Sequence, residues 1–82
     1  MTLTIRYFAA LRDKMGTAEQ IVDHMPGLNG GGLAEWLIAR DPAAQALAHP
    51  SVRVIVNDEI ASRSQPLQDG DTIAFCPPFS GG

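Results

Sequence analysis

Two stretches of alternating apolar residues constrain the fold of this chain more than any other feature. Residues 2–8 carry apolar side chains at every odd position from 3 to 7, and residues 52–57 carry valine at positions 52, 54 and 56. Alternation of this kind, with β-branched and aromatic residues, is typical of strands that bury one face. The sequence therefore predicts a β-sheet with one face turned toward a core.

One segment between these strands has helical periodicity instead. From Leu33 to Arg40 the residues at positions i, i+3, i+4 and i+7 form one face, which predicts a helix over residues 31–40. Asn29 is the best N-cap residue near its start, and Asp41-Pro42 is expected to end it.

The remaining segments complete a simple order of elements. Weaker strands are expected over residues 18–25 and 59–63, and a final strand over residues 72–76. Asn57-Asp58 and Asp69-Gly70 are expected to form tight turns, because these residue types tolerate positive φ. A loop with one helical turn is expected after the first strand, and a short helix over residues 43–48. The order β-β-α-β-β-β predicts an α+β fold, a mixed or mostly antiparallel sheet packed on one main helix.

Composition excludes several classes of function. The chain has 82 residues, enough for one domain, and a formal net charge of −3, which argues against nucleic-acid binding. Cys76 is the only cysteine, so no intrachain disulfide can form, as is usual in a reducing cytosol. Neither a signal peptide nor a membrane span is evident, so we expect a cytoplasmic protein without a metal site.

Candidate catalytic groups are few, and each has a simpler structural interpretation. The glycines from Gly27 to Gly32 are not followed by the Lys and hydroxyl of a phosphate-binding loop, so a flexible connection is expected. Cys76 has no evident base beside it and is expected to be an inert thiol. Trp36 is expected to lie in the core. The acidic residues near turns are expected to be turn formers: Asp58, Glu59, Asp69 and Asp71.

The C-terminal segment Pro-Pro-Phe-Ser-Gly-Gly, residues 77–82, is the strongest functional indication. We expect a folded domain over residues 1–76 followed by a flexible tail, whose prolines favour an extended exit. Phe79 is a potential anchor, and Gly81 and Gly82 can enter a channel too narrow for side chains. The α-carboxylate of Gly82 is a poor electrophile and must be activated, for instance as an acyl-adenylate.

Two stretches carry a resemblance to a known family. The stretch "LQDGDTIAFCPPFSGG" resembles the C-terminal signature of the small subunit of molybdopterin synthase, and "IRYFAALRDKMG" is similar to that family's first strand and following loop. The resemblance implies a ubiquitin-like β-grasp fold. It implies that Gly82 is adenylated by an E1-like activating enzyme that uses ATP and magnesium, and is then converted to a thiocarboxylate by a sulfur donor protein.

The same resemblance implies how the chain works with its partners. The tail, including Phe79, Ser80 and Gly81, would insert into a large subunit that holds the catalytic residues and would give sulfur to cyclic pyranopterin monophosphate. Two small subunits would flank a large-subunit dimer, with no cofactor bound tightly to the small subunit. The residues expected to face the partner are Phe8, Phe75, Pro77 and Pro78.

The chain departs from the family's pattern at two positions, and two alternative functions remain open. The family often has a bulky apolar residue where this chain has Cys76, and a smaller aliphatic residue where it has Phe79. A sulfur carrier for thiamine, cysteine or tRNA thiolation would carry the same tail. A β-grasp module that binds partners without covalent chemistry is the other alternative.

Overall fold

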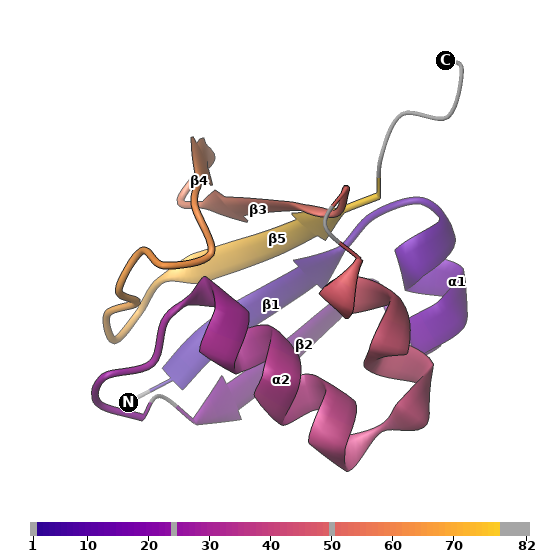
Figure 1. Ribbon diagram of the computed structural model, residues 1–82, viewed down its shortest axis with the longest axis horizontal. Helices are drawn as coiled ribbons and strands as arrows, with labels where there is room; N and C mark the ends of the chain where they lie inside the picture. The colour runs from indigo at the N-terminus through magenta and orange to yellow at the C-terminus, as the bar shows by residue number, and fades with distance from the viewer. Residues whose placement is uncertain (1, 24, 50, 78–82) are drawn as a thin grey trace.

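The computed structural model describes residues 2–23, 25–49 and 51–77. Five strands form one sheet in the order β2-β1-β5-β3-β4 (Figure 1). The central pair, β1 and β5, is parallel, and every other neighbouring pair is antiparallel. The mixed sheet expected from the sequence is therefore confirmed. The strands are β1 (Thr2–Tyr7), β2 (Glu19–Asp23), β3 (Arg53–Val56), β4 (Glu59–Ala61) and β5 (Thr72–Cys76).

One main helix, α2 (Gly30–Arg40), packs across one face of the sheet (Figure 1). The side chain of Asn29 accepts a hydrogen bond from the Gly32 amide at 2.7 Å, as expected of an N-cap. Two shorter elements accompany it, the helix α1 (Ala10–Met15) and the 3₁₀ helix η1 (Pro42–Ala48). They occupy the segments in which one helical turn and a short helix were expected.

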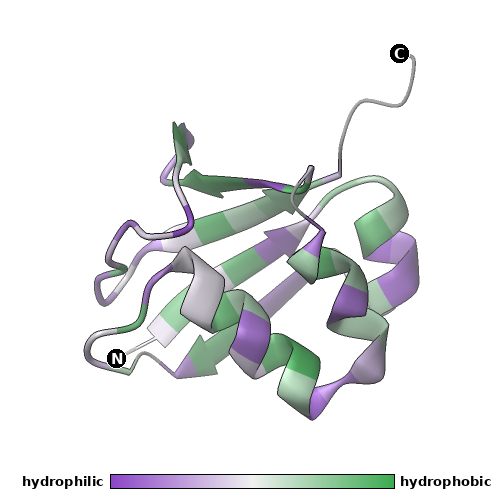
Figure 2. Cartoon of the chain, in the orientation of Figure 1, coloured by the Kyte–Doolittle hydropathy of each residue, from purple (hydrophilic) through white to green (hydrophobic). Residues whose placement is uncertain are grey.

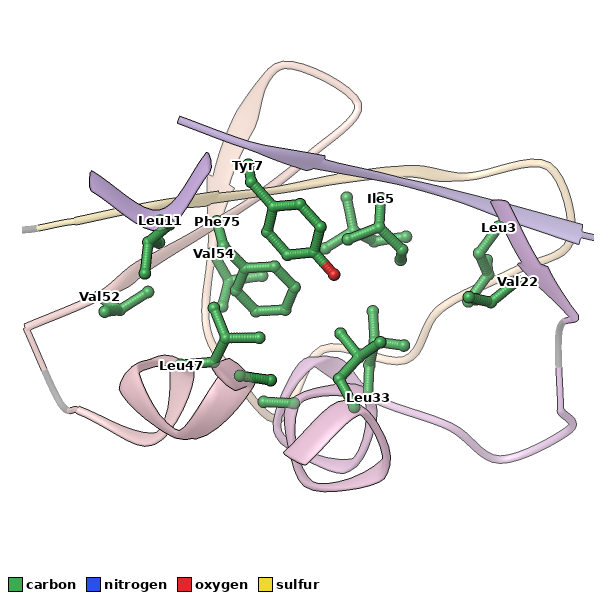
Figure 3. Packing of buried hydrophobic residues seen from close by; sticks show 14 of the residues in the cluster. Leu3, Ile5, Tyr7, Leu11, Val22, Leu33, Leu47, Val52, Val54 and Phe75 are labelled. Atoms are coloured by element: carbon green, nitrogen blue, oxygen red, sulfur yellow. The ribbon is translucent and has the colours of Figure 1, made fainter. Parts of the chain in front are cut away.

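The core lies between the sheet and the helices, as Figure 3 shows. The alternation of side chains along β1 determines which of them enter the core. Leu3, Ile5 and Tyr7 are buried, whereas the residues between them are not. Alternate residues are buried in the same way around β3: Val52, which precedes the strand, and Val54 and Val56 within it. The helices contribute mainly Leu33, Leu37, Ala44 and Leu47.

The buried face of α2 differs slightly from the predicted one. Its buried residues are Gly30, Leu33, Ala34 and Leu37. Trp36 is only half-buried at the edge of the core. The guanidinium of Arg40 lies 4.5 Å from the centre of the Trp36 ring, in a cation–π arrangement.

Gly30, Gly31 and Gly32 make the first turn of α2, which begins one residue before the predicted helix, so the prediction of a flexible connection is wrong for these three glycines. A Cβ on Gly30 would lie 3.3 Å from Val54 Cγ1 and 3.4 Å from Arg63 Cα. The amide of Gly31 donates to the carbonyl of Arg63 at 2.8 Å. Glycine lets the helix start against the backbone at Arg63 without this crowding.

Both tight turns form where predicted, and their polar side chains tie them to neighbouring segments. Asn57 and Asp58 both have positive φ, 50° and 70°, in the turn between β3 and β4. Asn57 accepts a hydrogen bond from the Thr72 amide at 3.0 Å and donates one to Asp71 at 2.9 Å. Asp69 accepts one from the Thr2 amide at 2.7 Å. Glu59 is not a turn former, because it begins β4.

Candidate functional site

Because β1 and β5 pair in parallel, their carboxyl ends lie side by side at one end of the sheet, which we call the exit edge (Figure 1). Tyr7 lies opposite Phe75, and the amide of Phe8 donates to the carbonyl of Phe75 at 3.3 Å. Phe8 therefore lies beside the point where the chain leaves the sheet through Cys76 and Pro77. The expected tail begins at this edge.

The expectation that Phe75 faces a partner is wrong. Its side chain is fully buried, and its ring stacks against the ring of Tyr7 with centroids 6.3 Å apart. Figure 3 shows both rings inside the core. The reason is strand alternation: Phe75 shares a side of β5 with the buried Ile73.

The opposite face of the sheet carries an exposed apolar surface next to the exit edge. Phe8 is 40 % exposed and Ile60 is 71 % exposed. Ile55 lies between Ala74 and Ile60 in the strand register, and Figure 2 colours much of β3 and β4 as hydrophobic. We call these four residues the outer-face patch: Phe8, Ile55, Ile60 and Ala74, of which Ala74 is only 7 % exposed.

A shallow hollow of about 190 Å³ lies within the outer-face patch. Arg6 and Asp58 line it together with Phe8, Ile55 and Ala74. The Arg6 guanidinium lies 5.5 Å from the centre of the Phe8 ring. The patch thus combines apolar area with one charge of each sign, which suits recognition of another protein.

Sequence reasoning found Phe8 but missed Ile55 and Ile60. A signal for Ile55 was present, because it interrupts the alternation of β3 with an apolar residue on the side that faces away from the core. Ile60 lies directly opposite Ile55 across the tight turn. Together they indicate an apolar outer face.

Pro77 lies against a second hollow on the helix side of the exit edge. This hollow of about 240 Å³ has Leu11, Val52 and Ala46 among its apolar lining residues. Pro77 is half-buried, so the start of the expected tail packs on the domain. The other expected tail residues lie outside the described residues, and their predicted roles stay predictions: Pro78, Phe79, Ser80, Gly81 and Gly82.

The thiol and imidazole groups that the structure describes have no catalytic arrangement. Cys76 is half-buried, and burial raises the pKa of its thiol. A raised pKa keeps the thiol protonated and weakens it as a nucleophile. The ring of His49 accepts a hydrogen bond from the Ser51 amide at 3.0 Å, which stabilises a turn.

The described ranges contain neither a candidate metal site nor a helix that could cross a membrane. In residues 2–23, 25–49 and 51–77, no group of three or more His, Cys, Asp or Glu side chains could hold a metal ion. Within the same ranges, every helix is too short or too polar to cross a bilayer.

Known proteins resemble this chain over its whole length. A Chlamydomonas reinhardtii protein named molybdopterin synthase sulfur carrier subunit is 30 % identical over 83 residues, covering 100 % of both chains. The Escherichia coli protein of the same name is 33 % identical over 82 residues, covering 98 % of this chain and 99 % of its own. The resemblance to this subunit expected from the sequence is therefore confirmed.

Solved structures confirm the ubiquitin-like β-grasp fold. The small archaeal modifier protein SAMP1 of Haloferax volcanii superposes with a TM-score of 0.86 at 25 % identity, with full coverage of both chains. A subunit from the complex of subunits 1 and 2 of the molybdopterin-converting factor of Helicobacter pylori superposes at 0.69 and 19 % identity, also with full coverage. A profile of the ThiS family matches residues 5–82. The chain therefore belongs to the ThiS family.

Proposed function

We propose that this chain is the sulfur-carrier subunit of molybdopterin synthase. The carboxylate of Gly82 is adenylated by an E1-like activating enzyme that uses ATP and magnesium, and a sulfur donor protein converts it to a thiocarboxylate. The large subunit, which holds the catalytic residues, receives the tail and directs its sulfur to cyclic pyranopterin monophosphate. The small subunit binds no cofactor tightly and acts in the cytosol, where its lone cysteine stays reduced.

The observation that carries this proposal is full-length similarity to two proteins named as molybdopterin synthase sulfur carrier subunits. The family match extends to residue 82 and so includes the two terminal glycines. A carrier needs a small folded domain followed by residues without side chains, and Gly81 and Gly82 meet the second requirement. Catalytic side chains are not required, because the partner proteins provide them.

The described residues supply a docking surface in this proposal. The outer-face patch lies beside the strand end from which residues 77–82 continue. A partner that covers Phe8 and Ile55 would hold the domain while the tail reaches its reaction centre. Apolar contact of this kind contributes most of the binding energy at protein interfaces, and a few aromatic residues dominate it.

The test is the intact mass of the chain after incubation with the activating enzyme, ATP and a sulfur source. Formation of a thiocarboxylate increases the mass by the exchange of one oxygen for one sulfur. The Cys76→Ser variant should show the same increase, which excludes sulfur carried on the thiol. Deletion of Gly82 should abolish it without changing the fold, and a wild-type chain that stays unmodified with a competent enzyme would contradict the proposal.

A sulfur carrier for another pathway is the second candidate, favoured by the structural similarity to a small archaeal modifier protein. The acceptor distinguishes the two. Thiocarboxylated chain mixed with the large subunit should convert cyclic pyranopterin monophosphate to the dithiolene product. Transfer only to a thiazole synthase, to a cysteine precursor or to tRNA would favour the second candidate. A module that only binds partners predicts that deletion of Gly82 leaves its partners' function intact.

A further inference from the structure

The strand β2 forms one open edge of the sheet, on the side away from β5. It spans five residues and contains neither proline nor lysine, two residues that commonly protect edge strands from pairing. The other edge strand, β4, has only three residues. Short edge strands offer little backbone to a partner, so β2 is the better template for an added strand.

The hydrogen-bond pattern shows which backbone groups of β2 face outward. The backbone amide of Tyr7 donates to the carbonyl of Ala18 at 3.0 Å, so Tyr7 and Ala18 form a hydrogen-bonded pair. Hydrogen-bonded and non-hydrogen-bonded pairs alternate along an antiparallel ladder. The Thr4–Ile21 pair, three positions from Tyr7–Ala18, is therefore a non-hydrogen-bonded pair. In agreement, the Thr4 amide donates away from β2, to the carbonyl of Asp71 at 3.0 Å.

It follows that the N–H and C=O groups of Glu19, Ile21 and Asp23 point to the open edge. Those of Glu19 are already engaged, because Thr17 Oγ1 donates to the Glu19 carbonyl at 2.8 Å and accepts from its amide at 3.3 Å. Within the described ranges, Ile21 at the centre of the strand has no neighbouring strand on that side. It offers a donor and an acceptor that fit a single residue of an antiparallel partner.

The side chains on the outer face of β2 specify the chemistry of that partner. Ile21 is 67 % exposed and lies between the exposed carboxylates of Glu19 and Asp23. On the other face, a hollow of about 220 Å³ runs from Gln20 and Val22 to Trp36 and Arg40 of α2, so the acidic side chains that would attract a basic segment are those of the outer face. An added strand would place alternate side chains over Ile21 and over this hollow.

We propose that the β2 edge accepts an extended segment of a basic partner protein as a sixth, antiparallel strand. The segment carries a β-branched apolar residue opposite Ile21, with Lys or Arg two positions to either side, opposite Glu19 and Asp23. The net charge of −3 favours such a partner at longer range. The inference is independent of the C-terminal tail and of the sulfur chemistry proposed for it.

A second copy of this chain is a poorer occupant than a basic partner. A two-fold dimer through β2 would be antiparallel and centred on Ile21. Glu19 of one copy would then lie opposite Asp23 of the other, twice in each dimer. Like charges directly opposite each other destabilise strand pairing.

The probe is a capped peptide with the sequence Thr-Lys-Thr-Val-Thr-Lys-Thr, compared with the same peptide carrying Glu in place of both Lys. Titration into the ¹⁵N-labelled full chain should shift the Ile21 and Asp23 amide resonances first and slow hydrogen exchange at Ile21. The Glu peptide should bind at least about fivefold more weakly, because two favourable cross-strand pairs become repulsive. Added salt should reduce this difference.

Two kinds of variant separate the backbone contribution from the charges. Ile21→Pro removes the outward N–H at a position where an edge strand tolerates proline, and it should abolish binding, whereas Ile21→Thr should retain it. Glu19→Lys with Asp23→Lys should reverse the preference between the peptides. Asp13→Lys with Glu59→Lys changes the net charge equally at exposed sites in α1 and in β4, the strand at the opposite edge of the sheet, and should leave the preference unchanged.

Three results would overturn the proposal. The first is the absence of any shift at millimolar peptide, and the second is equal binding of the two peptides. The third is a concentration-dependent shift of Ile21 without peptide, which would make β2 a self-association edge. Should Ile21→Pro fail to fold, the charge-reversal pair decides alone.

Discussion

The hydroxyl of Tyr7 donates a hydrogen bond to Oε1 of Gln20 at 3.0 Å, which joins β1 to β2 beneath the sheet. Burial raises the pKa of Tyr7 to about 12, and the carboxylate of Asp41 adds to the shift. The folded state thus favours the protonated phenol more strongly than the unfolded chain does, where the pKa is about 10.

This pKa predicts a loss of stability at high pH. The contribution of the protonated phenol is fully present below pH 10 and is lost as the pH rises toward 12, by up to about 3 kcal/mol. Tyr7 is the only tyrosine, so tyrosinate absorbance reports on it alone. Tyr7→Phe should flatten the pH dependence of urea unfolding between these values. An unchanged slope in the variant would show that another group causes the loss.

The two phenylalanines at the end of the central strands should behave in opposite ways. Phe75→Ala leaves a cavity beside Tyr7 and should lower the free energy of unfolding by about 3–5 kcal/mol. Phe8→Ala removes a surface ring and should cost less than about 1 kcal/mol, while weakening binding of the large subunit roughly tenfold or more. Urea unfolding and calorimetric titration measure the two effects. Equal destabilisation by both changes would contradict the assignment of Phe8 to a docking surface.

Neighbouring glycines in the first turn of α2 provide a matched comparison. Gly31→Ala should stabilise the protein by up to about 1 kcal/mol, because a Cβ there meets only ordinary contacts and alanine favours the helix. Gly30→Ala should lose that gain, since its Cβ would press on Val54 and on the backbone of Arg63. Thermal unfolding of both variants tests this. A higher stability of Gly30→Ala than of Gly31→Ala would refute the packing explanation.

Arg63 should stabilise the loop before β3. One nitrogen of its guanidinium donates to the carbonyls of Leu47, His49 and Val52 at 2.8, 3.1 and 3.2 Å. Arg63→Ala leaves these acceptors without their donor and should cost about 1–3 kcal/mol in urea unfolding. Arg53→Ala, an exposed change of the same chemistry on β3, should stay within about 0.5 kcal/mol. Similar costs for the two variants would show that the three hydrogen bonds contribute little.

Local sequence patterns predicted most of this fold, and the reason is physical. The alternation in residues 2–8 and 52–56 follows directly from which side chains must leave water. The N-cap at Asn29 and the turn at Asn57-Asp58 depend on residues close to them in sequence. Gly30 could not be explained this way, because the atoms that a Cβ there would crowd belong to Val54 and Arg63, which are distant in sequence.

The candidate site was predicted less completely. The resemblance placed Phe75 on the partner surface. Its position two residues after Ile73, on the same side of the strand, already indicated that it faces the core. The outer-face patch depends on the register between β3, β4 and β5, which brings Ile55, Ile60 and Ala74 together. Sequence periodicity gives the side of a strand that a residue occupies. It does not give the neighbouring strand, so the patch emerged only from the fold.

The position of β5 between β1 and β3 determines when this domain can form. β5 pairs residue 4 with residue 72, so the central contact joins segments from opposite ends of the sequence. In a growing chain that has not yet delivered residues 72–76, the strand pairs β1–β2 and β3–β4 are not joined in one sheet. Isolated two-stranded pairs are marginal in water. Folding must therefore wait for the last strand to leave the ribosome. A partner protein that recognises the completed sheet would consequently ignore every unfinished chain.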